Sequence, residues 1–149
     1  MSKKALFSGT FDPFTIGHHA LIKRALCLVD EIIIAVGINI GKKTMFSLEE
    51  RIDSIKKIYA EENSIKVISY NSLTIDLAKE LKVNFILRGI RNITDFEYEK
   101  NMAEINRHLS GIETVFLLSE PEYGYISSSL VRELISYNKD ISYLIPHIK

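Results

Sequence analysis

Short apolar runs alternate with amphipathic segments along nearly all of this 149-residue chain. The clearest run covers residues 32–36 (IIIAV), where no polar residue interrupts the apolar ones. A strand of this kind is buried on both faces, which is typical of a parallel sheet covered by helices. The alternation therefore predicts a single α/β domain over residues 1–149, with a Rossmann-like, five-stranded, mostly parallel sheet and helices on both faces.

Periodicity and capping residues place the individual elements. Ser47 and Glu50 form a capping-box pattern that opens a helix, and Gly111 ends the long helix that is expected to begin at Thr94. The first helix is expected to bury a stripe that extends to Leu28. The expected strands are residues 4–7, 31–36, 65–68, 85–87 and 114–118, and the expected helices are residues 16–28, 48–59, 75–81, 94–109 and 127–135.

Composition excludes some classes of protein. The chain carries 19 basic and 19 acidic residues, and this balance disfavours a non-specific nucleic-acid binder, which normally has a basic excess. No apolar run reaches the length that a bilayer requires, and no signal-peptide pattern precedes the first strand, so we expect a cytoplasmic protein that does not span a membrane. The one cysteine, Cys27, lies beside the apolar face of the first helix and is expected to be a packing residue.

Polar or glycine-rich segments follow each of the five expected strands. Because the carboxyl ends of parallel strands meet at one edge of a sheet, these segments are expected to form one ligand site. They are residues 10–18, Lys42, residues 71–74, residues 88–91 and residues 123–129.

The segment after the first strand has the features of a phosphate-binding turn. Gly9 and Gly17 allow the backbone to approach a ligand closely, and the N-terminus of the following helix offers unpaired N–H groups to an anion. Thr10 adds a hydroxyl group, and His18 lies in the first turn of the helix. An ordinary turn with a solvated histidine is the alternative.

Two further segments carry anion-binding side chains. Arg88 and Arg91 flank Gly89 after the fourth strand, and guanidinium forks suit phosphate oxygens, although the acidic residues at 95–99 are alternative ion-pair partners. The serines at 127–129 supply more hydroxyl groups than N-capping of the last helix needs. We find no nucleophile–base pair, no metal-ligand spacing and no P-loop, which favours a site that positions and neutralises phosphates.

These segments together resemble the bacterial phosphopantetheine adenylyltransferase family, a branch of the nucleotidyltransferase superfamily. The resemblance covers nearly the whole chain in order and spacing. It rests on GTFDP at 9–13, TIGH at 15–18, Lys42, RGIR at 88–91, DFEYE at 95–99, NRHL at 106–109 and ISSSLVR at 126–132.

The resemblance implies transfer of the adenylyl group of ATP to 4′-phosphopantetheine by in-line displacement, giving dephospho-coenzyme A and pyrophosphate. It implies catalytic roles for Thr10, Lys42 and Arg91, and for His18, which would stabilise charge on the α-phosphate. The implied phosphopantetheine-binding residues are Thr10, Lys42, Thr74 and Arg88. The implied ATP-binding residues are Thr10, Phe11, His18, Gly89, Ile90, Arg91, Glu99, Tyr123, Gly124, Tyr125, Ile126, Ser127, Ser128 and Ser129.

The resemblance further implies Mg²⁺ that accompanies ATP rather than a protein metal site, and a homohexamer, while feedback by coenzyme A stays open. This sequence departs from the family pattern at three points. Thr74 stands where a longer apolar residue is usual, Thr15 replaces the first histidine of the superfamily motif, and the chain ends at Lys149, before a C-terminal helical stretch that relatives often carry.

Other functions are compatible with parts of this pattern. A sister transferase that uses CTP, or nicotinamide mononucleotide with ATP, fits the superfamily motifs, although Lys42, Arg88 and residues 95–99 favour the pantetheine branch. A nucleotide-sensing module without catalysis would retain the nucleotide loops but not both His18 and Lys42. A flavodoxin-like electron carrier shares the strand–helix alternation but would have an aromatic-flanked flavin loop.

Overall fold

A single parallel sheet forms the centre of the computed structural model, which describes residues 2–38 and 41–148. Every pair of neighbouring strands is parallel, and the spatial order is β3-β2-β1-β4-β5. The strands are β1 (Lys4–Gly9), β2 (Glu31–Gly37), β3 (Ile65–Tyr70), β4 (Phe85–Ile90) and β5 (Glu113–Leu118). The predicted α/β class and the five-stranded sheet are confirmed.

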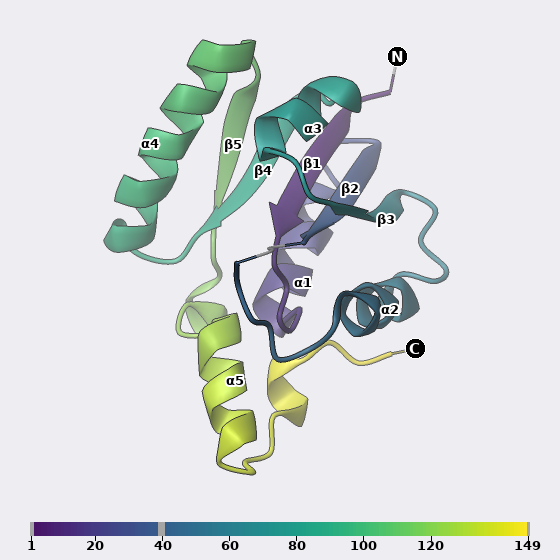
Figure 1. Cartoon of the computed structure of the whole chain (residues 1–149), viewed down its shortest axis with the longest axis vertical. Helices are drawn as coiled ribbons and strands as arrows, with labels where there is room; N and C mark the ends of the chain where they lie inside the picture. The colour runs from purple at the N-terminus through teal and green to yellow at the C-terminus, as the bar shows by residue number, and fades with distance from the viewer. Residues whose placement is uncertain (1, 39–40, 149) are drawn as a thin grey trace.

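Helices connect successive strands and cover the sheet on both sides (Figure 1). None of the helices in the described ranges is both long and apolar enough to cross a membrane. The helices are α1 (Ile16–Ala25), α2 (Leu48–Ile58), α3 (Thr74–Glu80), α4 (Ile93–Ser110) and α5 (Ser128–Ser136), with short 3₁₀ turns η1 (Pro121–Tyr123) and η2 (Ser142–Leu144).

The two central strands explain why both faces need helices. Successive side chains of a strand point to opposite faces. In β1, Phe7 packs into the core beneath α1 and α2, whereas its neighbour Leu6 packs with the residues of α3 on the other side. In β2, Ile34 and Ile33 divide in the same way. The apolar run at 32–36 therefore supplies both cores at once, as its composition predicts.

The first helix is shorter than its apolar spacing predicts. It ends at Ala25, with Leu26 as C-cap, and the following residues form a turn. Leu28 is consequently 44% exposed, and Ile22 takes the buried position that the sequence analysis did not assign. The prediction that Cys27 is a packing residue is wrong, because the turn exposes it and its thiol donates to Arg24 O at 3.0 Å.

Capping was predicted correctly at some helix ends and wrongly at one. The Ser47–Glu50 capping box at the start of α2 and the left-handed Gly111 (φ 78°) at the end of α4 are both present. Helix α4 begins earlier than expected, because the N-cap is Asn92 rather than Thr94, and Asn92 Oδ1 accepts from Asp95 N at 2.8 Å.

The sheet opens between β1 and β4, and this opening positions the site. Backbone pairing between these strands stops at Leu6 and Ile86, although β1 continues to Gly9 and β4 to Ile90. Beyond this last pair of residues, Ser8 O accepts from the Arg88 side chain, at 2.7 Å from Nη1, instead of from the backbone of β4. The strand order also reverses direction here, which is where ligands bind in open α/β sheets.

Candidate active site

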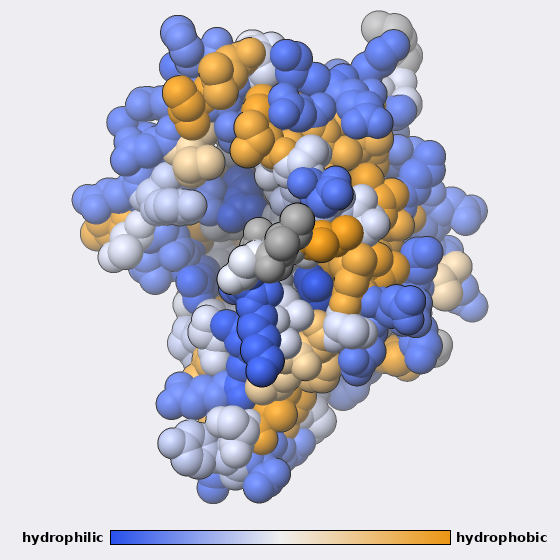
Figure 2. All heavy atoms as spheres, in the orientation of Figure 1, coloured by the Kyte–Doolittle hydropathy of each residue, from blue (hydrophilic) through white to orange (hydrophobic). Residues whose placement is uncertain are grey.

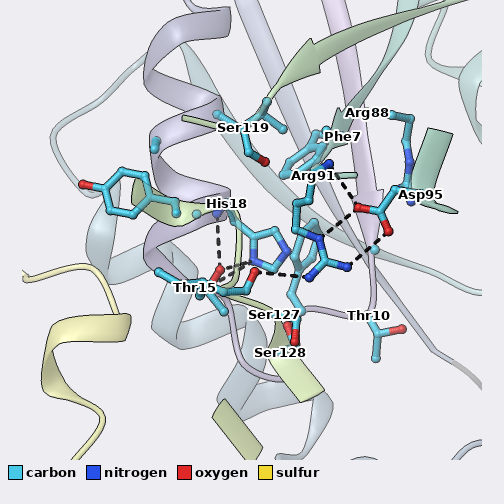
Figure 3. Close-up of a pocket in the computed structure, with 18 of the residues that line it drawn as sticks. Phe7, Thr10, Thr15, His18, Arg88, Arg91, Asp95, Ser119, Ser127 and Ser128 are labelled. Carbon is cyan, nitrogen blue, oxygen red and sulfur yellow. Dashed lines mark hydrogen bonds and ion pairs between the residues drawn. The ribbon is translucent and has the colours of Figure 1, made fainter. Parts of the chain in front are cut away.

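A cavity of about 460 Å³ lies at the carboxyl ends of β1 and β4, within the usual size range of small-molecule sites. Residues from the β1–α1 turn, β4, the start of α4 and the N-terminus of α5 line it. Figure 3 shows His18, Arg91 and Ser127 facing one another in this cavity. Four of the five segments that were expected at one edge of the sheet therefore meet in this cavity, whereas residues 71–74 do not line it.

His18 is held by the cap of its own helix. Thr15 is the N-cap of α1, and His18 occupies the third helical position, where a capping box usually has Glu or Gln. Its Nδ1 accepts from Thr15 N at 2.9 Å, so a neutral His18 ring carries its proton on Nε2. The Thr-x-x-His spacing is the local sequence signal from which this arrangement could have been predicted.

Aromatic rings surround the His18 imidazole. Phe11 and Phe14 lie 5.1 and 5.2 Å from it between ring centroids, and Phe7 lies at 6.1 Å. Desolvation by this burial lowers the pKa of His18 from 6.5 to about 3, and the charges of Arg88 and Arg91 act in the same direction. His18 is half-buried among these rings, and its lowered pKa makes it a neutral, oriented N–H donor, which the alternative of a freely solvated histidine does not explain.

We expect the His18 ring to stay neutral at pH 5. Its pKa is lower in the folded than in the unfolded chain, so its contribution to stability is complete above pH 6.5 and is lost as the pH falls from 6.5 toward 3. Nitrogen NMR of the imidazole should show only the Nε2–H tautomer at pH 5. A doubly protonated ring at that pH would contradict this.

The two arginines line the cavity and also form ion pairs. Arg88 donates from Nε to Glu99 Oε2 at 2.9 Å and from Nη2 to Glu99 Oε1 at 2.6 Å. Arg91 is held by Asp95, with Nε to Oδ2 at 3.0 Å. Both guanidiniums are therefore oriented before any ligand binds. The ion pairs of the alternative interpretation are present, but they do not remove the arginines from the site.

The fourth strand is longer than predicted, and its length determines where the two arginines lie. Residues 85–90 all pair with β5, so Arg88, Gly89 and Ile90 belong to β4 rather than to a loop after it. A side chain at Gly89 would press on Leu21, since a Cβ there would lie 3.2 Å from Leu21 Cδ2, closer than an ordinary van der Waals contact. This strand geometry sends the Arg88 side chain toward β1 and leaves Arg91 at the start of the turn into α4.

The serines before α5 join it to the β1–α1 turn. Ser127 is the N-cap, and its Oγ accepts from Leu130 N at 3.1 Å. Ser128 Oγ donates to Pro13 O at 2.8 Å, and Ser129 Oγ accepts from Arg132 Nη2 at 3.1 Å. The positive end of a helix dipole therefore faces the cavity, in an arrangement suited to an anion.

Most of the expected site residues line this cavity, and four do not. Ile90 is buried in the sheet, Tyr125 is 62% exposed, and Gly124 lies at the end of η1 outside the lining. Thr74 lies elsewhere, as described below. The expected residues that line it are Thr10, Phe11, His18, Lys42, Arg88, Gly89, Arg91, Glu99, Tyr123, Ile126, Ser127, Ser128 and Ser129.

A second cavity of about 370 Å³ lies between α3 and α4. One apolar face of α4 lines it, with residues at spacings of four, three and four: Tyr98, Met102, Ile105 and Leu109. Figure 2 shows apolar surface over the upper end of α4. Thr74 belongs to this second cavity, where its Oγ1 lies 3.2 Å from the hydroxyl of Tyr70.

The two cavities adjoin. Ser8, Gly9, Arg88 and Glu99 line both of them. A molecule in the second cavity can therefore reach the first cavity beside the Arg88–Glu99 ion pair.

Several lining residues were not assigned from the sequence. Asp12, Asp95 and Arg132 stand inside motifs that the sequence analysis quoted, so the motifs were a usable signal for them. Arg24 and Ser119 also line the first cavity, and Arg24 Nη1 donates to Leu118 O. No local pattern pointed to these two, because helix α1 and the end of β5 meet only in the folded chain.

Across 2–38 and 41–148, no group of three His, Cys, Asp or Glu side chains is placed to hold a metal ion.

Known proteins match the chain over nearly its full length. Residues 6–134 match the family described as Cytidylyltransferase-like. The phosphopantetheine adenylyltransferase of Bacteroides thetaiotaomicron is 55% identical over 144 residues, covering 97% of this chain and 95% of that protein. The protein of the same name from Flavobacterium psychrophilum is also 55% identical, with the same coverage. The chain belongs to the phosphopantetheine adenylyltransferase family.

Solved structures at lower identity share the fold of this phosphopantetheine adenylyltransferase family member. A bifunctional NMN adenylyltransferase/ADP ribose pyrophosphatase from Francisella tularensis superposes with a TM-score of 0.70 at 18% identity, over 97% of this chain and 44% of that one. A lipopolysaccharide core biosynthesis protein from Thermoplasma volcanium superposes with a TM-score of 0.59 at 21% identity, over 80% of this chain and 98% of that one. At these identities the likeness concerns the fold alone.

Proposed function

We propose that this protein transfers the adenylyl group of ATP to 4′-phosphopantetheine and releases pyrophosphate, a step of coenzyme A biosynthesis. Two adjoining cavities are the main support for this proposal: five Lys and Arg side chains line the first, and the second is largely apolar. A reaction that joins a nucleotide to the phosphate of a long, partly apolar acceptor needs two such sites with a shared boundary. The names of the relatives agree with it.

The first cavity is proposed to bind ATP. The N-terminus of α5, Thr10 and the Arg91 guanidinium would contact its phosphates, and the strand segment at Gly89 and the residues before α5 would contact the nucleoside. Glu99 is proposed to act mainly by orienting Arg88, because both of its carboxylate oxygens accept from that guanidinium.

The second cavity is proposed to bind the pantetheine arm of the acceptor. Apolar side chains of α4 would pack against the arm, and Thr74 with Tyr70 would offer hydroxyl groups to its amides. Arg88, at the boundary, would hold the acceptor phosphate, and Lys42 would approach it from the first cavity. The short Thr74 side chain leaves room in this cavity that a longer apolar residue would fill.

The proposed chemical step is a single displacement. An oxygen of the acceptor phosphate bonds to the α-phosphorus of ATP, the bond from that phosphorus to the bridging β-phosphate oxygen breaks, and pyrophosphate carries away the electron pair. A phosphate monoester is already largely dianionic near pH 7, so the nucleophile needs no general base. His18 would donate its Nε2–H to the α-phosphate, where charge develops, and Lys42 and Arg91 would neutralise the phosphates.

Further partners follow from the same proposal. Mg²⁺ would enter on the ATP phosphates, since it usually keeps several waters and is held largely by substrate phosphates. Coenzyme A contains the acceptor's arm and an adenine nucleotide, so it would compete for both cavities. The use of ATP as donor supports a cytoplasmic location. Exposed apolar side chains, among them Ile93 at 78% and Leu118 at 68% exposed, support contacts between copies of the chain, as the proposed homohexamer requires.

The assay that tests this function measures pyrophosphate released by the purified protein with ATP and Mg²⁺. We expect release only when 4′-phosphopantetheine is added, with background rates when nicotinamide mononucleotide replaces the acceptor or CTP replaces ATP. Equal turnover with nicotinamide mononucleotide or with CTP would assign the chain to a sister transferase. Nucleotide binding without turnover of any acceptor would assign it to the nucleotide-sensing class.

A further inference from the structure

Arg51 is a buried arginine without an acidic partner in the part of the chain that the structure describes. It lies in the first turns of α2 and is only 5% exposed. No carboxylate of residues 2–38 or 41–148 forms an ion pair with it. Burying a charge is costly, and packing alone would be served equally well by an apolar side chain. Its hydrogen bonds therefore need an explanation.

The Arg51 guanidinium joins three separate chain segments through their carbonyl groups. Nη1 donates to Thr10 O at 2.7 Å and to Gly37 O at 3.1 Å, and Nε donates to Phe46 O at 3.2 Å. These carbonyls belong to the turn after β1, the end of β2 and the segment before α2. A planar fork with fixed donor directions holds such an arrangement more rigidly than an ammonium group does.

Asp12 also links the β1–α1 turn to the segment before α2, through its side-chain oxygens. Its side chain is buried, and its Oδ2 and Oδ1 accept from Met45 N and Phe46 N, both at 2.9 Å. Arg132 Nη1 donates to Asp12 O at 2.8 Å and so fixes Asp12 from the side of α5. Arg51 and Asp12 thus bind the segment before α2 to the β1–α1 turn from both sides.

The segment held in this way carries Lys42. This lysine lies three residues before Met45, is exposed, and lines the same cavity as Thr10 and His18. An exposed lysine on a flexible stem is placed by its backbone, so the backbone attachment decides where the ammonium group can reach. A displacement of about 1 Å at a reacting centre can cost on the order of 100-fold in rate.

We propose that Arg51, together with Asp12, is a positioning residue that sets the location of Lys42 relative to Thr10 and His18. The inference rests on the proposed transferase function, in which Lys42 contacts the phosphates. Arg51 itself touches no substrate in this scheme. Its effect on the reaction passes through the segment that holds Lys42.

A double-mutant cycle between Arg51→Lys and Lys42→Ala tests the proposal. Arg51→Lys keeps the charge but loses the planar fork whose Nε and Nη1 reach the three carbonyls. We expect kcat to fall about 30- to 100-fold, with each KM changing less than about threefold. In a Lys42→Ala background the same substitution should lower kcat less than about threefold, because the group that it positions is already gone. Fold losses that multiply in full would overturn the proposal.

Asp12→Asn supplies the second variant if Arg51→Lys does not fold. It replaces one of the two carboxylate oxygens that accept from Met45 N and Phe46 N with an NH2 group, and its kcat loss should likewise disappear in the Lys42→Ala background. The matched control is Ile55→Val in the same helix, a fully buried residue that contacts neither segment through a hydrogen bond. It should lower Tm by a few degrees and leave kcat unchanged in both backgrounds.

The outcomes separate this inference from the function on which it rests. An unaltered protein without transferase activity would remove the proposed function. An active protein whose Arg51→Lys and Asp12→Asn losses both multiply with that of Lys42→Ala would remove only the positioning role.

Discussion

Replacing His18 with alanine should lower kcat about 100- to 1,000-fold, the usual loss when a preorganised donor to a developing oxyanion is removed. The His18 ring is neutral, and its Nδ1 is already occupied by Thr15 N, so Nε2–H is available for one bond in a fixed direction. The KM for ATP should change far less than kcat, because the donor acts most strongly in the transition state. Steady-state pyrophosphate release with both substrates varied measures this split.

The same histidine also contributes to the cap of α1, so stability needs its own control. We expect His18→Ala to cost on the order of 1 kcal/mol in the free energy of unfolding, measured by urea titration. His147→Ala is the matched variant, because His147 is exposed near the end of the chain and should leave kcat and stability unaltered. If His18→Ala retained its turnover, or lost it only in proportion to unfolded protein, the proposed donor role would be wrong.

Arg88→Ala should lower kcat/KM for 4′-phosphopantetheine about 100-fold, near the upper end of what hydrogen bonds to a charged group contribute. Arg88 lies at the boundary of the two cavities, so its loss should affect the acceptor more than ATP. Arg88→Lys keeps the charge but loses the fork that Glu99 orients, and most of the loss should remain. Initial rates with the acceptor varied at saturating ATP measure the effect.

Removing Arg88 also leaves Glu99, 12% exposed, without its partner, and thermal unfolding should report a lower Tm. Arg107→Ala is the control, since the Arg107–Glu113 pair is more than half exposed on both sides and should contribute little. A loss for ATP as large as the loss for the acceptor would contradict the assignment of Arg88 to the acceptor phosphate.

The sequence was a good guide wherever the relevant signal is local. Capping residues mark the start of α2, Gly111 marks the end of α4, and the run at 32–36 predicts burial on both faces. Local signals were poorer guides to where elements stop. Apolar spacing continued to Leu28 although α1 ends at Ala25, since spacing registers which side chains share a face but not whether the backbone is still helical.

In the candidate site, too, local motifs were predicted well and the packing of distant segments was not. Sequence motifs alone group Thr10, His18, Lys42, Arg88 and Arg91 as a phosphate-binding set, because each motif is a short segment with its own chemistry. Four other expected residues, Thr74 among them, do not line the first cavity. Which cavity a residue lines depends on how helices pack, and no local pattern encodes that.

The sequence by itself determined the α/β fold, the edge of the sheet where the ligand-binding segments meet, and the family. Only the tertiary structure decided the protonation state of His18 and the ion pairs that Arg88 and Arg91 form with Glu99 and Asp95. It also decided that the site consists of two adjoining cavities, and that Arg51 binds the segment before α2 to the β1–α1 turn. The physical reason is that pKa shifts and hydrogen bonds depend on distances between atoms far apart in the chain. Arg51 and Thr10 are 41 residues apart, and Arg51 Nη1 lies 2.7 Å from Thr10 O only because β1, β2 and α2 pack together.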